Sequence, residues 1–276
     1  MPRDPHVHFP AFRHHEEARQ EANNAMMALL VGAQVSAQFL ELSRGSSKLL
    51  SEIFPGISHI KRLDLRPEAA QSILRGAEQH LGAMAVPQAL AIHEGFILDC
   101  LDLLGVQAVK AFKMHAELAT HAGSALDADL LSRFHVLREM RNAVIHRSGT
   151  ADHRLVAVIR DLTPAGDSEW KKHAGRSPVG IRGGDRVTFM LGELVLTLAT
   201  TKALAREANR MLIKAIPSAK WAEVIVDDHL QQTTKKLDSR QRRRAILGLR
   251  RFSYAVTSVS DAELEVAAAA RGVPMT

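Results

Sequence analysis

The chain has 276 residues, of which 46% are hydrophobic and 24% are charged, enough for one large globular domain or for a domain with an appended module. Its single cysteine, Cys100, excludes an internal disulfide and any zinc site that needs two or more thiolates. The sequence shows no secretory leader pattern and no uninterrupted run of about 18 apolar residues. We therefore expect a cytoplasmic protein that does not cross a membrane.

The net charge of +6 is concentrated in one segment. Residues 235–251 contain eight Lys or Arg and one acidic residue, Asp238, so the rest of the chain is close to neutral. Aromatic residues make up only 4% of the chain, which disfavours modules that stack the bases of a single strand on exposed rings. Binding of a polyanion is therefore expected in this segment or in a specific pocket.

Apolar residues recur at helical spacing over most of the chain. Pro87 is expected in the first turn of one helix, where its missing N–H needs no partner. Ser260 and Glu263 have the spacing of a capping box at the start of another. The pattern predicts helices at residues 13–42, 67–83, 88–104, 106–121, 126–148 and 191–215, and two or three short helices within 218–276.

Two short runs have a different character. Residues 154–162 (RLVAVIRDL) and 185–191 (DRVTFML) are rich in β-branched and aromatic residues, which favour strands. The residues between these runs include two Pro and five Gly, a composition typical of a loop. The sequence therefore predicts a small β-hairpin insertion at about 154–190.

These patterns predict three regions. Residues 1–20 are expected to form an N-terminal leader, and residues 21–216 a helical domain that contains the β-hairpin. Residues 217–276 are expected to form a basic C-terminal helical extension. The fold class is therefore all-α with a small β insertion.

The most informative stretch is 138–149, at the end of a predicted helix. Arg141 lies on the arc of this helix that is expected to face the core, where an unpaired guanidinium would cost several kcal/mol. Asn142 and His146 lie one turn apart along the edge of that arc, so Arg141, Asn142 and His146 border one groove. The residues of the expected core arc are Leu130, Phe134, Leu137, Val144 and Ile145.

A structural interpretation of the same residues is available. Arg141 would pair with a carboxylate of the helix at 88–104, where Glu94 and Asp99 are candidates. His146 would then cap the C-terminus of its own helix, where a cationic side chain is favourable.

The string from Arg141 to His146, with Asn142 directly after the arginine and Gly149 beyond the histidine, resembles the Arg-x(4–6)-His signature of the HEPN superfamily. The earlier helix with Glu94 among apolar residues is similar to the family pattern as well. The resemblance implies an HEPN-like helical bundle that forms a homodimer through the signature helix. It also implies a metal-independent endoribonuclease of toxin or antiviral defence type, without a cofactor; other members are catalytically silent binding modules.

The resemblance implies a role for each signature residue. Cleavage by attack of the RNA's own 2′-hydroxyl needs a base, an acid and a cation on the phosphate. His146 would act as base or acid, Arg141 would bind the scissile phosphate, and Asn142 would orient the imidazole or hydrogen-bond the phosphate. Glu94 and Arg138 are expected to support these residues.

The basic C-terminal segment is either a solvated helix face or an RNA-docking patch, and the residues in question are Arg240, Arg242, Arg243 and Arg244. The expected partners are RNA, a second copy of the chain and an antitoxin or other partner protein. The alternatives are a silent HEPN-like module that binds RNA or protein, and a helical scaffold whose basic tail contacts DNA. No metal site is expected from the N-terminal histidines, because they lack carboxylates on the same helix face; they are His6, His8, His14 and His15.

Overall fold

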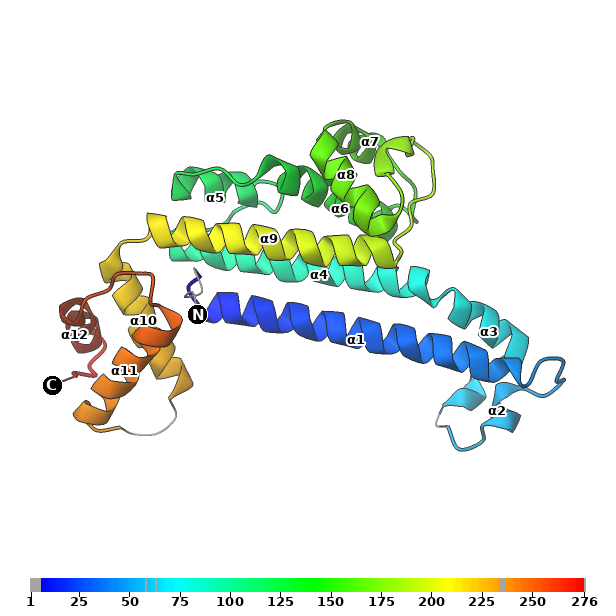
Figure 1. Cartoon of the computed structure of the whole chain (residues 1–276), viewed down its shortest axis with the longest axis horizontal. Helices are drawn as coiled ribbons and strands as arrows, with labels where there is room; N and C mark the ends of the chain where they lie inside the picture. Colours follow the sequence, from blue (N-terminus) through cyan, green and yellow to red (C-terminus); the bar gives the residue numbers. More distant parts are fainter. Residues whose placement is uncertain (1–5, 58, 63, 234–236, 276) are drawn as a thin grey trace. The chain divides into compact units, whose positions relative to one another are not determined.

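The computed structural model describes residues 6–57, 59–62, 64–233 and 237–275, and these residues are mostly helical (Figure 1). This confirms the all-α prediction. In chain order the elements are α1 (Pro10–Glu41), α2 (Leu50–Ile53), the 3-10 turn η1 (Ile60–Arg62), α3 (Pro67–Arg75), α4 (Ala77–Leu103), α5 (Met114–Ala122), α6 (Ala128–His146), α7 (His153–Arg160), α8 (Pro164–Ala174), the 3-10 turn η2 (Pro178–Gly180), α9 (Leu191–Ala215), α10 (Ser218–Gln232), α11 (Ser239–Ser253) and α12 (Asp261–Ala270).

Several predicted helices are confirmed. Helix α9 has the predicted bounds, and α1 and α6 differ from the predicted ranges by a few residues at their ends. Three helices follow α9, and the capping box at the start of α12 is present, with the Ser260 hydroxyl accepting from the Glu263 N–H. Helix α5 is shorter than predicted, because residues 106–113 precede it as turns and coil.

The prediction that Pro87 begins a helix is wrong. The helices separate at Gly76, and α4 then runs for 27 residues, from Ala77 to Leu103, with Pro87 inside it. Proline has no N–H to donate to the carbonyl of Ala83, so one backbone hydrogen bond of α4 is missing. Val86 and Leu90 on either side are fully buried, and their burial offsets this cost. Helix α4 is also long and apolar enough to cross a membrane, a test that core helices of soluble proteins pass as well.

The predicted β-hairpin at 154–190 is wrong. Residues 154–160 lie in α7, and residues 164–174 form α8. The extended pairing present there is one isolated antiparallel bridge between Thr150 and Arg186.

The local sequence explains both helices. In α7, Leu155 and Ile159 are buried one turn apart, and the Asp152 carboxylate caps the helix by accepting from the Leu155 N–H at 3.1 Å. In α8, Pro164 occupies the first turn and Gly175 ends the helix in the left-handed region, at φ 67°. Proline and glycine thus mark the two ends of α8.

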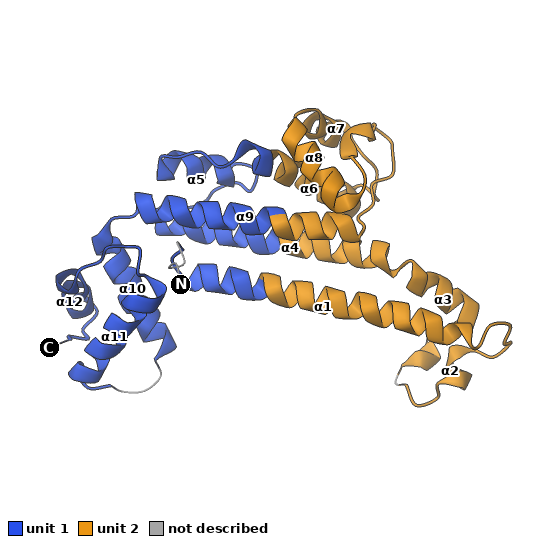
Figure 2. Cartoon of the chain, viewed as in Figure 1, with its two compact units in different colours: residues 1–18, 91–131, 200–276 blue, residues 19–90, 132–199 orange. Residues whose placement is uncertain are grey.

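The described residues form two compact units (Figure 2). One unit contains residues 1–18, 91–131 and 200–276, and the other contains residues 19–90 and 132–199. This division differs from the expected boundaries after residues 20 and 216. The expected leader includes the start of α1, and Phe9 and Phe12 are buried rather than part of an extended tail.

Aromatic side chains form the core of the first unit. The ring centroid of Phe9 lies 5.9 Å from that of Trp221 and 6.1 Å from that of Phe96. The side chain of Asn209 holds the start of the chain, because its amide donates to the Val7 carbonyl at 2.7 Å and its oxygen accepts from the Val7 N–H at 3.0 Å. These paired hydrogen bonds explain why the N-terminal residues pack into this unit.

The second unit contains residues 132–146 of α6, all of α7 and α8, and the beginning of α9. Its buried side chains include Phe134, Trp170 and Phe189. At Gly82 a methyl group would lie 2.7 Å from the Phe189 carbonyl oxygen, so only glycine allows this close backbone approach. The signature residues 138–149 belong to this unit.

Candidate active site

The buried face of α6 differs from the expected arc. Val136, Leu137, Met140 and Ala143 are almost completely buried, whereas the Ile145 side chain is 50% exposed. The expectation that Ile145 faces the core is therefore wrong, whereas Phe134 and Leu137 of the expected arc are completely buried. Helix α6 carries apolar residues on both sides, and the packed set is the one that recurs at positions 136, 140 and 143.

The side of α6 away from Met140 carries all three signature residues, but it also carries the completely buried Phe134. Taking about 100° per residue, Arg141, Asn142 and His146 all lie within about 90° of the side directly opposite Met140. Arg141 and Asn142 are half-buried, and His146 is exposed in the last turn. The structure therefore brings these three side chains to one surface, on which Ile145 lies between Arg141 and His146.

Arg138 lies on the same face but is engaged locally. Its guanidinium Nη2 lies 3.6 Å from the Glu139 carboxylate, and both side chains are only 12% exposed. This shielded pair engages Arg138 locally, and its predicted support of the signature residues remains a prediction.

His135 was missed by the sequence reasoning. It precedes Asn142 by seven residues, or about two helical turns, and so lies on the same stripe of α6. Burial lowers the pKa of His135, the positive charge of Arg138 lowers it further, and Glu139 opposes both effects. The signal that could have found His135 is this seven-residue spacing.

A tight turn ends the signature helix. The N–H groups of Arg147 and Gly149 both donate to the Ala143 carbonyl at 3.0 Å, and Gly149 has φ 78°. The Gly149 carbonyl accepts from the Val187 N–H at 2.7 Å, so hydrogen bonds connect the turn to residues 184–187. Only glycine adopts this backbone conformation without strain, which gives Gly149 a structural reason beside its place in the HEPN-like pattern.

Two carboxylates stabilise the surroundings of this turn. Arg147 pairs with Asp152 at 2.7 Å. Burial raises the pKa of Asp152, but the Leu155 N–H and the Arg147 charge outweigh this effect and the net shift is downward. Asp152 thus remains ionised, caps α7 and holds the residue that follows His146.

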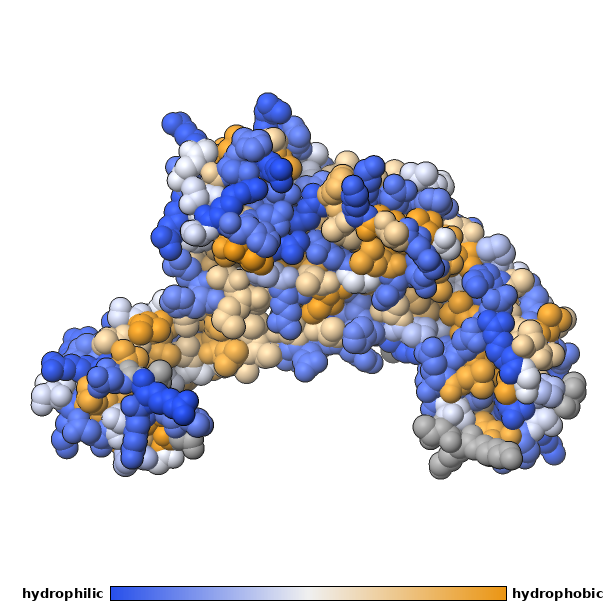
Figure 3. All heavy atoms as spheres, turned by 180° about the vertical axis from the view of Figure 1, so that it is seen from behind, coloured by the Kyte–Doolittle hydropathy of each residue, from blue (hydrophilic) through white to orange (hydrophobic). Residues whose placement is uncertain are grey.

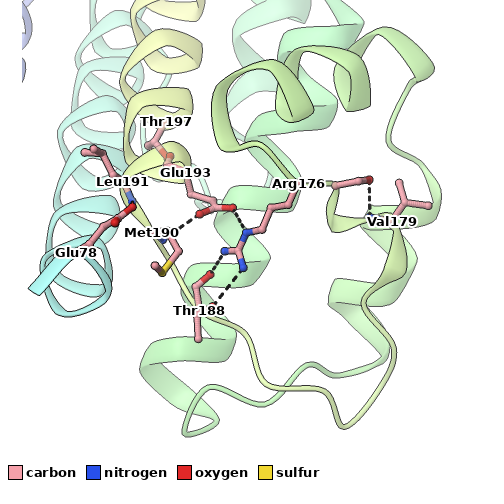
Figure 4. Close-up of polar contacts among 9 residues, drawn as sticks. Glu78, Arg176, Val179, Thr188, Met190, Leu191, Glu193 and Thr197 are labelled. Carbon is pink, nitrogen blue, oxygen red and sulfur yellow. Dashed lines mark hydrogen bonds and ion pairs between the residues drawn. The ribbon is translucent and has the colours of Figure 1, made fainter. Parts of the chain in front are cut away.

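The second carboxylate is Glu193, at the start of α9 (Figure 4). Its side chain accepts from the Arg176 Nε at 2.7 Å and from the Met190 N–H at 2.9 Å. Arg176 also donates to the Thr188 carbonyl at 2.8 Å. This network fixes residues 188–190, just beyond the segment that binds Gly149.

Glu94 belongs to the other compact unit, in the part of α4 that follows residue 90. Its predicted support of Arg141 remains a prediction.

The four basic residues proposed for RNA docking lie on α11, and two of them are used internally. Arg242 donates to the carbonyls of Pro274 at 2.9 Å and Leu237 at 3.0 Å. Arg243 pairs with Glu265 at 3.4 Å. Arg240 and Arg244 are exposed, and Arg251 continues the same stripe, because positions 240, 244 and 251 fall on one side of a helix.

Within the described part of the chain, no group of three or more His, Cys, Asp or Glu side chains could hold a metal ion. Comparisons with protein-family models, with curated proteins and with solved structures give no match. The functional interpretation therefore rests on the residues of α6 and their geometry.

Proposed function

We propose that the chain is a metal-independent endoribonuclease of the HEPN type that acts as a toxin or antiviral defence effector. The observation that supports this most directly is the shared face of Arg141, Asn142 and His146 at the end of α6. The opposite face of α6 is fully packed, so these polar residues are not needed to fill the core.

The chemistry follows from the residue types. The 2′-oxygen of RNA attacks the adjacent phosphorus while a base removes its proton, and the bond to the 5′-oxygen breaks as an acid protonates it. The products are a 2′,3′-cyclic phosphate and a 5′-hydroxyl. His146 performs one of the two proton transfers, and Arg141 stabilises the charge on the phosphate.

A second copy of the chain would complete the site. Arg141 and His146 are separated by five residues and diverge by about 140° around the helix axis, so one helix does not aim both at the same atom. An isologous contact through α6 would place a second Arg141 and a second His146 at the twofold axis. The half-exposed Ile145 would be covered by such a contact.

The test is cleavage of a mixed RNA in EDTA by purified protein, with the termini of the fragments analysed. We expect a 2′,3′-cyclic phosphate, and His146→Ala should reduce the rate by about two to four orders of magnitude. His121→Ala is the matched control, because His121 is an exposed histidine outside α6. Full activity of folded His146→Ala protein would refute the mechanism.

The dimer has its own test. Ile145→Glu should shift sedimentation from dimer to monomer and reduce cleavage, while the exposed Met84→Glu should change neither. A strict monomer that still cleaves RNA would overturn the composite site. RNA binding without cleavage in wild-type protein would instead support the silent HEPN-like module.

A further inference from the structure

A second surface of the molecule, remote in sequence from α6, contains an apolar groove. The second half of α1, together with α2, η1 and α3, encloses a groove of about 480 Å³. All but one of its lining residues are apolar; its walls include Val35, Phe39, Phe54, Ile57, Ile73 and Leu74. Figure 3 shows apolar side chains at the surface of this segment, at the lower left of that view.

The groove has a buried floor and exposed walls. Leu40, Leu50, Ile60 and Ala70 form a buried cluster beneath it. Above this floor the walls remain accessible, since Phe39 is 55% exposed and Val35, Ile57 and Ile73 are exposed to a similar degree. A preformed apolar groove of this kind is typical of a site that binds an apolar partner.

An apolar stripe on α1 continues the groove. Val31, Val35 and Phe39 are exposed at intervals of four residues along one side of α1, and Leu42 follows three residues later in the turn after the helix. Leu42, at the end of this stripe, is 82% exposed. From Val31 to Leu42 the stripe extends over about three helical turns, which is long enough to contact a second helix lying alongside it.

The rim of the groove carries uncompensated positive charge. Lys61 and Arg62 directly follow the floor residue Ile60, and Lys48 precedes Leu50 by two positions. All three are exposed, and they enter no ion pair within the described residues.

Of the nearby carboxylates, Asp64 is exposed and follows Arg62 by two positions, and three others already have partners. Glu41 accepts from Gln71 and pairs with Arg75 at 3.2 Å. Glu52 accepts from the Leu49 N–H at 2.7 Å, and Glu68 accepts from the Gly45 N–H at 2.6 Å. The charge that this rim offers to a ligand is therefore positive.

We propose that this groove binds an amphipathic helix of a partner protein, with apolar side chains facing the groove and acidic residues along its flanks. Helix-in-groove recognition uses apolar anchors at positions i, i+3 or i+4, and i+7, which match the spacing of the α1 stripe. Acidic flanks would complement Lys48, Lys61 and Arg62. This interaction is separate from ribonuclease chemistry and does not depend on it.

Two other occupants fit the surface less well. An isologous contact would bring the same basic rim into the interface from both copies, which doubles the positive charge there without supplying a matching negative surface. A lipid surface is broad and would leave the concave groove between α1 and α3 unfilled. A helix fills the groove and also neutralises its rim.

The experiment uses a displayed library of 20-residue amphipathic helices whose polar face varies freely between Asp, Glu, Lys, Gln and Ser. The full-length protein is the target, and the variant Phe39→Ser/Ile57→Ser is the counter-target. These two side chains are more than half exposed, so their loss should leave the melting temperature almost unchanged. Met84→Ser, another exposed apolar residue of the same unit, is the matched control.

We expect selection of helices with large apolar anchors and Asp or Glu on both flanks. A selected peptide carrying a fluorescent label should bind Phe39→Ser/Ile57→Ser and Lys61→Glu/Arg62→Glu at least tenfold more weakly than wild type or Met84→Ser. Replacing its acidic residues by Lys should also weaken binding at least tenfold.

Three results would overturn the proposal. The first is no enrichment over the counter-target, and the second is enrichment of basic or uncharged flanks. The third is that Phe39→Ser/Ile57→Ser abolishes self-association or binding to phosphatidylserine vesicles while peptide binding is unchanged. That third result would assign the groove to a second copy or to a lipid surface.

Discussion

The Nε atom of Arg176 lies 2.7 Å from the carboxylate of Glu193, and this carboxylate is only 1% exposed (Figure 4). The pair joins the segment just after α8 to the first turn of α9. Because Glu193 also accepts from the Met190 N–H, one buried carboxylate fixes the last residues before α9. These residues follow the segment that binds the end of the signature helix.

The first prediction concerns this pair. Arg176→Ala should lower the free energy of unfolding by about 3 kcal/mol, because it leaves the buried Glu193 carboxylate without its cationic partner. Lys172→Ala, which breaks the exposed pair with Glu169, should cost less than about 1 kcal/mol. Urea unfolding of both variants measures the difference, and equal midpoints would contradict the structural role of the buried pair.

The second prediction concerns the turn after the signature. Gly149→Ala should destabilise the protein by about 1 kcal/mol, because alanine is strained at φ 78° and its Cβ would lie 3.4 Å from the Val187 carbonyl oxygen. Cleavage of RNA should fall as well, since the turn holds the residues that follow His146. Gly180→Ala is the control, because a Cβ there meets only open space. Identical melting temperatures for the two variants would refute this prediction.

The third prediction is a pH dependence of stability that arises in the first unit. His93 is fully buried, with its Nε2 3.0 Å from the Nε2 of His115 and its ring against His15. Burial, reinforced by His115 and His15, holds the pKa of His93 well below its usual range. The folded state therefore keeps His93 neutral at a pH at which the unfolded chain binds a proton.

This contribution to the free energy of unfolding should be complete above the unfolded pKa of about 6.5. As the pH falls below that value, the free energy of unfolding should decline by up to about 1.4 kcal/mol per pH unit for one proton. Urea unfolding of wild type between pH 7.5 and 5 measures this slope. His93→Gln should flatten it, whereas His121→Gln, at an exposed position, should leave it unchanged. A slope that is unaffected by His93→Gln would remove His93 as its source.

The fourth prediction separates two groups of arginines on α11. Replacing the exposed stripe Arg240, Arg244 and Arg251 by Gln should weaken binding of all RNA sequences alike. It should also flatten the salt dependence by about 0.7 log units for each phosphate of a single strand that the variant no longer neutralises. Titration of one fluorescent RNA at three salt concentrations measures this slope.

The comparison variant is Arg242→Gln/Arg243→Gln, whose side chains contact Pro274, Leu237 and Glu265 within the protein. It should lower the melting temperature and leave the salt slope nearly unchanged. An unchanged slope in the stripe variant would eliminate RNA docking by α11.

Helices with a single dominant pattern were predictable from the sequence, and α1 and α9 are examples. Residues 154–162 were not, because Val156, Val158 and Ile159 favour a strand by composition. The helical alternative depended on Leu155 and Ile159 being one turn apart behind the Asp152 cap, and tertiary burial of both decided the outcome. Tertiary burial also explains why Pro87 does not begin a helix, since its buried neighbours compensate for the missing hydrogen bond inside α4.

The candidate site was predictable in position but not in orientation. The helical spacing of Arg141, Asn142 and His146 predicted that they border one surface; Arg141 and Asn142 are half-buried in the structure, and His146 is exposed. Which side of α6 faces the core was not decided by the sequence, because Val144 and Ile145 compete with Val136 and Met140 as apolar candidates. Contacts such as that of Arg242 with Pro274 lie 32 residues apart and leave no local pattern.

The bridge between Thr150 and Arg186 brings together the two ends of the segment that contains α7 and α8. A segment whose ends are already joined can change length without moving what lies outside it, since doubling such a loop costs only about 0.6 kcal/mol of closure entropy. The stretch from Val179 to Gly183 is the natural place for insertions, because it lies after Arg176 and the buried Pro178 and before the bridge. Evolution can therefore vary this stretch as an accessory module while the end of α6 keeps its geometry.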